Sequence, residues 1–327
     1  MTSAATSTGS TGGLPASAAG PTPADLAARF PRATALVHEI HALSTPLLAR
    51  QVEQNIARHG EAFWAEAERL LALAEHLPGA PLAALLDYTV AYLKAQAAFL
   101  ETDEYSHADF DVVRREVYDN PDVMERFYLL GLLLTHAFWP IHFDIHTFFR
   151  REFLPQVPAV GVGAEIGYGH GLYLLEVLTA HPQATTVSFD ISRYSQDFAG
   201  RLLRAGGIAP CRFDLRLGDV RQPLPLGTRH CEWMICAEVL EHIPDPALAL
   251  REISRCLAPG GPLFVTTVVD SNALDHLYRF RDVDEVYALL AECGFGLAAR
   301  RTFAVREYDA RTRDPSVDVA LVCMRAR

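Results

Sequence analysis

After Pro158 the chain alternates short apolar segments with helix-like stretches, and this alternation restricts the possible folds more than any other feature of the sequence. Five of these apolar segments come first: 159–166, 185–190, 211–217, 231–236 and 262–269. Each is followed by a helical stretch or a loop, which predicts parallel strands joined by right-handed crossovers. Two more, 296–305 and 316–325, are separated by a turn and can pair as an antiparallel hairpin. The pattern predicts a doubly wound α/β sheet.

Residues 23–155 follow a different pattern, which is helical throughout. Apolar residues recur at helical spacing through 70–77 and again through 82–99. Asn120 followed by Pro121 predicts a further helix start, and the apolar stretch 127–138 that follows should be buried until Pro140 bends or ends the helix. Residues 1–22 are almost entirely Ser, Thr, Ala, Gly and Pro, which predicts a disordered tail. We expect three parts: a tail over 1–22, a helical region over 23–155 and the α/β domain over 156–327.

Composition narrows the classes of partner. The formal net charge of −11 argues against broad contact with a phosphate backbone, which depends on clustered Lys and Arg. No apolar run reaches the roughly 18 residues of a membrane helix. The six cysteines form no C-x-x-C pair, and the N-terminus lacks a secretory signal, so we expect reduced thiols and a cytoplasmic protein. A small-molecule substrate is expected, with neither nucleic acid nor membrane as partner; the oligomeric state is not predicted.

A glycine-rich turn follows the first predicted strand. It reads Glu165-Ile166-Gly167-Tyr168-Gly169-His170-Gly171, and glycines let backbone amides approach a ligand closely. A dinucleotide-binding turn of the form G-x-G-x-x-G would need glycine where Leu172 stands. The turn therefore predicts a nucleotide-like ligand other than NAD(P).

Acidic residues then follow the next strands in order. Asp190 ends the second strand, where a carboxylate can accept hydrogen bonds from ribose hydroxyls, and Gly218-Asp219-Val220 ends the third. After the fourth strand the chain reads Ala237-Glu238-Val239-Leu240-Glu241-His242-Ile243, and Leu257-Ala258-Pro259-Gly260-Gly261 leads into the fifth. These residues should meet at the carboxyl edge of the sheet, where such folds bind ligands.

Together these motifs resemble the class I S-adenosylmethionine-dependent methyltransferases, over about 159–327. The resemblance implies a Rossmann-like seven-stranded sheet with S-adenosyl-L-methionine (SAM) as cofactor, covered here by an all-helical N-terminal lid. It also implies a role for each motif. The methionine end would contact Glu165, Gly167, Tyr168, Gly169 and Gly171; the ribose Asp190 and Ile191; the adenine Gly218, Asp219 and Val220; and the sulfonium Ala237 and Glu238.

Transfer from a sulfonium requires alignment and exclusion of water, and sometimes a base. Histidine suits a base at neutral pH, so His242 and His276 are the candidate catalytic residues, with Tyr168 facing the sulfonium. The candidate substrate contacts are His136, Trp139, His142 and Tyr278. His142 and His146 are four residues apart, as in a metal pair, but no third ligand is evident, and no metal is expected.

The leading functional hypothesis is methyl transfer to a small molecule in specialised metabolism. The alternative is an azetidine-2-carboxylate synthase, a methyltransferase-like enzyme in which the amine of SAM attacks its own γ-carbon and methylthioadenosine leaves. Tyr168 and Tyr173 near the glycine turn are compatible with this reaction. A SAM-binding regulatory protein without activity is the third hypothesis, and the intact acidic set Glu165, Asp190 and Asp219 argues against it.

Overall fold

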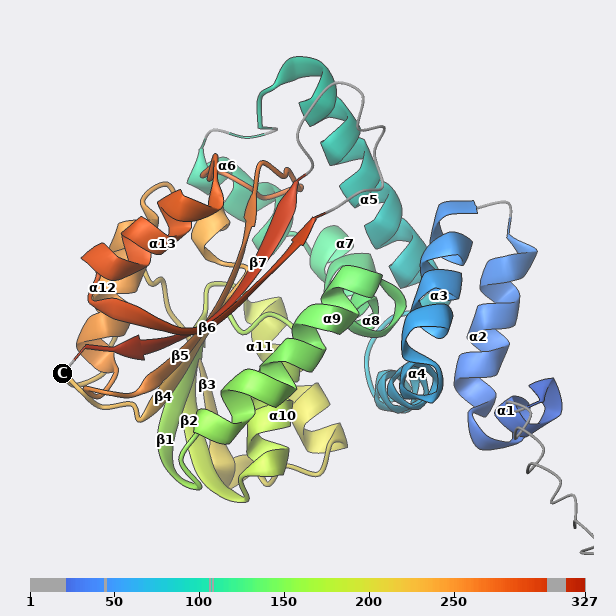
Figure 1. Ribbon diagram of the computed structural model, residues 1–327, viewed down its shortest axis with the longest axis horizontal. Helices are drawn as coiled ribbons and strands as arrows, with labels where there is room; N and C mark the ends of the chain where they lie inside the picture. The colour runs from blue at the N-terminus through green and yellow to red at the C-terminus, as the bar shows by residue number, and fades with distance from the viewer. Residues whose placement is uncertain (1–21, 44–45, 106, 108, 305–315, 327) are drawn as a thin grey trace, which may run out of the picture.

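The computed structural model describes residues 22–43, 46–105, 107, 109–304 and 316–326. A twisted sheet with helices on both faces forms the C-terminal part, and an array of helices forms the N-terminal part (Figure 1). The predicted tail lies outside the described residues, except for Thr22, which caps the first helix by accepting a hydrogen bond from the Asp25 amide.

The sheet has seven strands in the order β3-β2-β1-β4-β5-β7-β6, and β7 runs antiparallel to β5 and β6. Their bounds are β1 (Val160–Ile166), β2 (Gln183–Asp190), β3 (Phe213–Leu217), β4 (Trp233–Ala237), β5 (Pro262–Val269), β6 (Phe295–Ala304) and β7 (Val317–Arg325). The predicted Rossmann-like fold, including its antiparallel hairpin, is confirmed. The strand order reverses between β1 and β4, so the loops that follow these two strands open a crevice at the carboxyl edge.

Helices cover both faces of the sheet. Their bounds are α10 (Leu172–Ala180), α11 (Arg193–Ala205), α12 (Pro246–Cys256) and α13 (Val283–Glu292), with short 3-10 turns η5 (Pro210–Arg212) and η6 (Leu240–His242). Alternate residues of β4 point to opposite faces. Trp233 and Ile235 pack with α10 and α11, whereas Met234 and Cys236 pack with α12 and α13.

The N-terminal region is helical from Pro23 to Gln156, as predicted. Its elements are α1 (Pro23–Arg29), α2 (Pro31–Ala42), α3 (Pro46–His59), α4 (Glu61–Ala74), α5 (Pro81–Thr102), α6 (Phe110–Val113), η1 (Arg114–Tyr118), α7 (Pro121–Val123), η2 (Met124–Tyr128), α8 (Leu129–Phe138), α9 (Pro140–Phe148), η3 (Phe149–Phe153) and η4 (Leu154–Gln156). Three of them, η1, η2 and η3, are π-helical turns.

The helical region and one face of the sheet share a single apolar core. In α8, nine of the ten residues are buried, because α4, α5 and α9 surround this helix. Pro140 ends it, with Trp139 extended between α8 and α9. Phe149 and Phe153 then reach the sheet and contact Phe264 of β5, with ring centroids 4.9 and 5.6 Å away. No helix in the described part of the chain is both long and apolar enough to cross a membrane.

Candidate active site at the carboxyl edge of the sheet

One large cavity lies where the carboxyl edge of the sheet faces the helical region. Its sheet-side wall comes from the loops after β1, β2, β3, β4 and β5, and its other wall from α3, α5, α6, η1, η2, α8 and α9. The cavity therefore lies between segments far apart in the sequence. The predicted cofactor residues line it, with one exception: Glu165, Gly167, Tyr168, Gly169, Asp190, Ile191, Gly218, Asp219, Val220, Ala237 and Glu238.

The exception is Gly171, which shapes the turn but does not line the cavity. It has a left-handed φ of 81° at the N-cap of α10, and a Cβ there would lie 2.8 Å from the Cβ of Ala199. Gly169 has a φ of 47° and does line the cavity, so a side chain there would be strained and would enter the ligand space. The turn is a backbone cradle of the kind that a nucleotide-like ligand requires.

Two buried carboxyl groups stand beside this turn. Asp190 accepts hydrogen bonds from the amides of Gly169 (2.9 Å) and Ser192 (2.8 Å), and burial raises its pKa to about 6. Glu165 is also buried, and its Oε2 has no hydrogen-bond partner. Burial raises the pKa of Glu165 well above its usual range, and the charge of Asp190 adds to this. Both groups can accept hydrogen bonds from a ligand, which fits the ribose and the amino group of SAM.

The predicted adenine end has a partner that sequence reasoning missed. Asp219 forms a close ion pair with Arg221, whose Nη2 lies 2.6 Å from Oδ2. The Arg221 guanidinium stacks on Phe110 of α6, 3.5 Å from the ring centroid. Phe110 and Val220 both line the cavity, so an apolar ring from the helical region faces the sheet-side motif. Only the packing of α6 against this loop brings Phe110 there.

The segment that follows β4 forms the floor of the cavity and has a strained backbone at Glu238. Glu238 has a left-handed φ of 52°, and its amide donates to the carbonyl and to the hydroxyl oxygen of Thr266, both at 3.0 Å. Its Oε1 is buried without a hydrogen-bond partner. Burial raises the pKa of Glu238 well above its usual range, and the charge of the neighbouring Glu241 adds to this effect. A strained, half-buried acid with a buried Oε1, next to the end of a central strand, is typical of a ligand contact.

The two candidate catalytic histidines line the cavity side by side, with ring centroids 4.9 Å apart. The Nδ1 of His242 lies 3.0 Å from the Asp275 carbonyl, and that of His276 lies 3.0 Å from the Ser271 carbonyl. Because a carbonyl oxygen only accepts, each Nδ1 carries a proton, and Nε2 of a neutral ring keeps its lone pair. Burial lowers the pKa of His276 to about 4.

Asp275 connects the two walls of the cavity and was not predicted from the sequence. Its Oδ2 accepts hydrogen bonds from the hydroxyls of Tyr128 (2.6 Å) and Tyr118 (2.9 Å), both in the helical region. Burial alone would raise its pKa, but the nearby His242 and His276 and these two hydroxyls hold the pKa below its usual range. The ionised carboxylate can therefore persist in the wall of the cavity.

Three of the four predicted substrate residues, His136, Trp139 and His142, also line the cavity. The fourth, Tyr278, is not among the residues that line the cavity: its hydroxyl donates to Glu285 at 2.8 Å, and its ring packs on Phe280. Tyr168 does line the cavity, but its hydroxyl donates away from it, to the Arg216 carbonyl at 3.4 Å.

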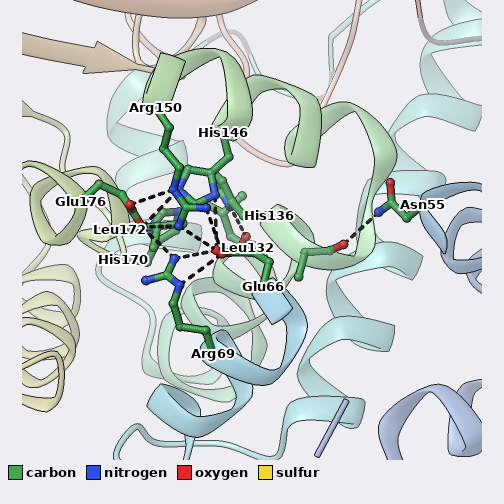
Figure 2. A network of polar contacts seen from close by, with 11 residues as sticks. Asn55, Glu66, Arg69, Leu132, His136, His146, Arg150, His170, Leu172 and Glu176 are labelled. Atoms are coloured by element: carbon green, nitrogen blue, oxygen red, sulfur yellow. Dashed lines mark hydrogen bonds and ion pairs between the residues drawn. The ribbon is translucent and has the colours of Figure 1, made fainter. Parts of the chain in front are cut away.

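The suggested metal pair is not formed. His142 shares a hydrogen bond with Thr135 (2.6 Å), whereas His146 lies between Glu66 and Glu176, with N–O distances of 3.5 and 3.3 Å. Figure 2 shows this second group, in which Arg69 and Arg150 hold both carboxylates. Among the described residues, one other trio, Glu241, His242 and His276, also brings ligand-capable atoms within 4.8 Å of one another.

Comparison with known proteins gives the class of this site. Residues 164–265 match the family of methyltransferase domains. The ubiquinone biosynthesis O-methyltransferase of Xanthomonas oryzae pv. oryzae (strain PXO99A) is 28% identical over 108 residues, which is 32% of this chain and 41% of that protein. Its counterpart from Pseudomonas paraeruginosa (strain DSM 24068 / PA7) is 31% identical over 84 residues, 26% of this chain and 35% of that protein. The chain thus covers less than half the length of these relatives.

Solved structures align over more than half of the chain. A geranyl diphosphate methyltransferase in complex with SAM has a TM-score of 0.48 and 13% identity, over 60% of this chain and 90% of that one. The cyclase SpnF also has a TM-score of 0.48, with 18% identity over 57% and 82% of the two chains. Sheet order, motifs and family match identify the α/β part as a class I SAM-dependent methyltransferase domain, whose cofactor is SAM.

Proposed function

We propose that this chain is an enzyme that transfers the methyl group of SAM to a small molecule enclosed between the sheet and the helical region. The observation that carries the proposal is the single cavity shared by the cofactor motifs and by His136, Trp139 and His142 of the helices. An enclosed site excludes water and holds a small acceptor against the cofactor. The helical region then acts as a lid and supplies the acceptor pocket.

The residues of the chain have separable tasks in this proposal. When bound, SAM supplies a methyl group on a sulfonium, which is an excellent leaving group. Glu165, Asp190 and the glycine turn hold the cofactor, and Glu238 lies on the floor beside the acceptor. His242 can take a proton at Nε2, because its Nδ1 proton is engaged by the Asp275 carbonyl. Alignment and water exclusion supply most of the rate, with His242 as base for acceptors that carry a proton.

The acidic chain and the cavity between the sheet and the helical region support a small metabolite of specialised metabolism as acceptor and argue against nucleic acid. We also propose a cytoplasmic location. Five of the six cysteines are buried free thiols, and Cys211 is exposed and free. Free thiols persist in a reducing compartment.

The test combines the purified chain with SAM, with and without a panel of small amines, alcohols, phenols and carboxylic acids, and mass spectrometry identifies the products. S-adenosylhomocysteine together with a methylated acceptor is the expected result. Methylthioadenosine from SAM alone would show cyclisation instead and contradict the proposal. Binding of SAM without any product would point to a regulatory protein. Asp190→Ala should lose affinity for SAM at least tenfold, since two charge-assisted hydrogen bonds of about 1.5 kcal/mol or more are removed.

A further inference from the structure

The cavity has an unbalanced set of charges. Six carboxyl residues line it: Glu165, Asp190, Asp219, Glu238, Asp275 and Asp318. Among the described residues that line it there is neither lysine nor arginine. Burial also lowers the pKa of its histidines, to about 4 in His142 and His276 and to about 3 in His170, so these three rings are neutral at pH 7. The described wall therefore offers hydrogen-bond acceptors to a ligand, and its acids offer negative charge once a cationic ligand favours their ionised forms.

Four of these acids, Glu165, Asp190, Asp219 and Glu238, belong to the predicted cofactor contacts, and one of the four, Glu238, shares a further part of the cavity with Asp275 and Asp318. Tyr88 of α5 identifies that part: burial raises its pKa well above the usual range, and the charges of Asp275, Glu238 and Asp318 raise it further. The three acids come from the loop after β5, the end of β4 and the start of β7. All three acids and Tyr88 line the cavity, and Tyr128, whose ring centroid lies 5.6 Å from that of Tyr88, donates its hydroxyl to Asp275 at 2.6 Å.

Aromatic rings line the same part of the cavity. Tyr88 lies 5.6 Å from Tyr128 and 5.7 Å from Trp139, and Tyr92 lies 5.2 Å from Trp139, as ring-centroid distances. All four rings line the cavity. Ring faces beside carboxylates attract a cation through the ring quadrupole and direct charge pairing, and they repel an anion. We refer to Tyr88, Tyr92, Tyr128 and Trp139 as the aromatic wall.

The described residues of the cavity wall bring neither lysine nor arginine to Glu238 and Asp275. Glu238 keeps an Oε1 without a hydrogen-bond partner, and burying an unpaired carboxylate is costly. Asp275 accepts two tyrosine hydroxyls and remains ionised. A cationic ligand beside Glu238, Asp275 and the aromatic wall would offset this cost, whereas a carboxylate or phosphate would increase it.

We propose that the acceptor is an amine, bound as its ammonium ion between the aromatic wall and the carboxylates Glu238, Asp275 and Asp318. This inference rests on the proposed methyl transfer. The ammonium first gives one proton to Glu238 or to Nε2 of His242. The amine lone pair then forms a bond with the methyl carbon as the carbon–sulfur bond breaks, and that electron pair stays on sulfur as the thioether leaves. The product is the N-methylated ammonium, and one proton is released to solvent per turnover.

A divalent metal ion is the competing occupant, because Glu241, His242 and His276 lie close enough together to share one. The aromatic wall favours the amine, since a metal ion needs oxygen, nitrogen or sulfur ligands and gains little from ring faces. The two occupants predict opposite responses to chelators, so one experiment can separate them.

The experiment uses acceptors matched in shape but not in charge: 2-phenylethylamine, 2-phenylethanol and 3-phenylpropanoate, and likewise hexylamine, 1-hexanol and hexanoate. Calorimetry on the full chain saturated with S-adenosylhomocysteine measures binding, and turnover with SAM is measured with EDTA and with added Mg²⁺. In at least one set, the amine should bind at least ten times more tightly than the alcohol, and the carboxylate should not bind. EDTA should not change turnover. Methylation of an alcohol or acid in preference to the amine, or turnover only with metal, would overturn the amine while leaving methyl transfer intact. Failure of every amine to bind would also overturn it. Methylthioadenosine from SAM alone would instead remove the proposed function itself.

Two variants assign the effect to this part of the cavity. Asp318→Asn and Trp139→Leu should each weaken amine binding at least fivefold and leave affinity for S-adenosylhomocysteine within twofold. Asp197→Asn, on the exposed face of α11 and paired only with Arg201, is the matched control and should change neither value. Equal amine binding by both folded variants and the wild type would show that the amine lies elsewhere and overturn the assignment.

Discussion

At the scale of single residues, burial shifts the pKa values of the acids and of the histidines of the site in opposite directions. It raises the pKa of Asp190 to about 6 and lowers that of His276 to about 4, because each charged form loses hydration. Without ligand, the site therefore holds partly protonated acids beside neutral histidines. Binding of a positively charged ligand should return the acids to their ionised forms.

Affinity for SAM should accordingly depend on pH through Asp190. Its pKa is raised on folding, so ionising it lowers the free energy of unfolding as pH rises from about 4 to 6, and this cost is constant above pH 6. Protons compete with the ribose hydroxyls for the carboxylate below pH 6. Affinity should rise up to tenfold per pH unit from pH 5 to 6 and become flat above pH 7. Calorimetry at four pH values checks this, and the same slope in Asp190→Asn would assign it to another group.

The site residues divide into those that a local pattern reveals and those that only packing brings near. Glu165, Asp190 and Asp219 were predictable, because each lies within two residues of the carboxyl end of a strand, and the carboxyl ends of parallel strands meet at one edge of the sheet. Phe110, Tyr118 and Asp275 were not, because they come from irregular segments whose positions depend on helix packing across the cavity. Tyr278 shows that proximity in the sequence is not enough, because His276 lines the cavity whereas the hydroxyl of Tyr278 donates to Glu285.

At the scale of elements, the strands and the long helices follow from periodicity, and the irregular turns do not. Each predicted strand lies within two residues of an observed one at both ends, because its apolar run is bounded by turn residues. The π-helical turns η1, η2 and η3 have no such signal, although η1 and η2 bring Tyr118 and Tyr128 to Asp275.

The contact between α5 and α8 positions part of the aromatic wall. A Cβ on Gly131 would lie 2.5 Å from the Cβ of Tyr88 and 2.6 Å from the Ala84 carbonyl, so the two helices approach closely there. Gly131→Ala should gain helix propensity of about 1 kcal/mol but lose more to overpacking, for a net loss of about 1 to 2 kcal/mol. Displacement of Tyr88 should also raise KM for the acceptor.

Urea unfolding and steady-state kinetics measure both effects. Gly227→Ala is the control, since nothing lies within 4 Å of the added Cβ, and it should change stability by less than about 0.5 kcal/mol. Unchanged stability and KM in Gly131→Ala would show that α5 and α8 can separate without disturbing the cavity.

A charged network joins α4, η3 and α10 beside the cavity (Figure 2). Arg150 donates to both Glu66 (3.0 Å) and Glu176 (2.9 Å), and Arg69 donates to Glu176 at 2.7 Å. Burial alone would raise the pKa of Glu176, but the close His146 and the hydrogen bonds from Arg150 hold that pKa well below 4.5. The network therefore fastens the helical region to the first helix of the α/β part.

Glu176→Gln should lower the free energy of unfolding by about 2 kcal/mol at pH 7, less than for a fully buried pair because the arginines are about one-third exposed. The pKa of Glu176 is lower in the folded state than in the unfolded state. Its ionised carboxylate therefore stabilises the fold at pH values above the unfolded-state pKa, and this stabilisation is lost as pH falls. The gap between wild type and variant should therefore be constant above about pH 5 and shrink below pH 4.5. Urea unfolding over pH 3.5 to 8 measures it, and Glu61→Gln, in an exposed pair with Arg29, is the control. A gap that widens in acid would contradict the linkage.

At the scale of the whole molecule, the helical region and the sheet form one core. The cluster that contains Phe63 and Leu133 of the helices continues through Phe149 to Phe264 of β5 and Val322 of β7. Only residues 157–159 separate the last helical turn from β1, which leaves the helical region little freedom to move away. The division into domains at residue 156 stays a prediction, since packing does not stop there.

A chain that begins at Val157 should therefore lack turnover even if its sheet still forms. It would lose Tyr88, Tyr128 and Trp139 from the cavity wall and would expose the face of the sheet around Phe264, which the helices now cover. Exposed apolar surface of this kind favours association. Size-exclusion chromatography should show aggregates or a low yield, circular dichroism should retain α/β character, and affinity for SAM should fall because Phe110 is missing. Full turnover by a monomeric truncated chain would refute the proposed lid, and with it the acceptor site between the aromatic wall and the carboxylates.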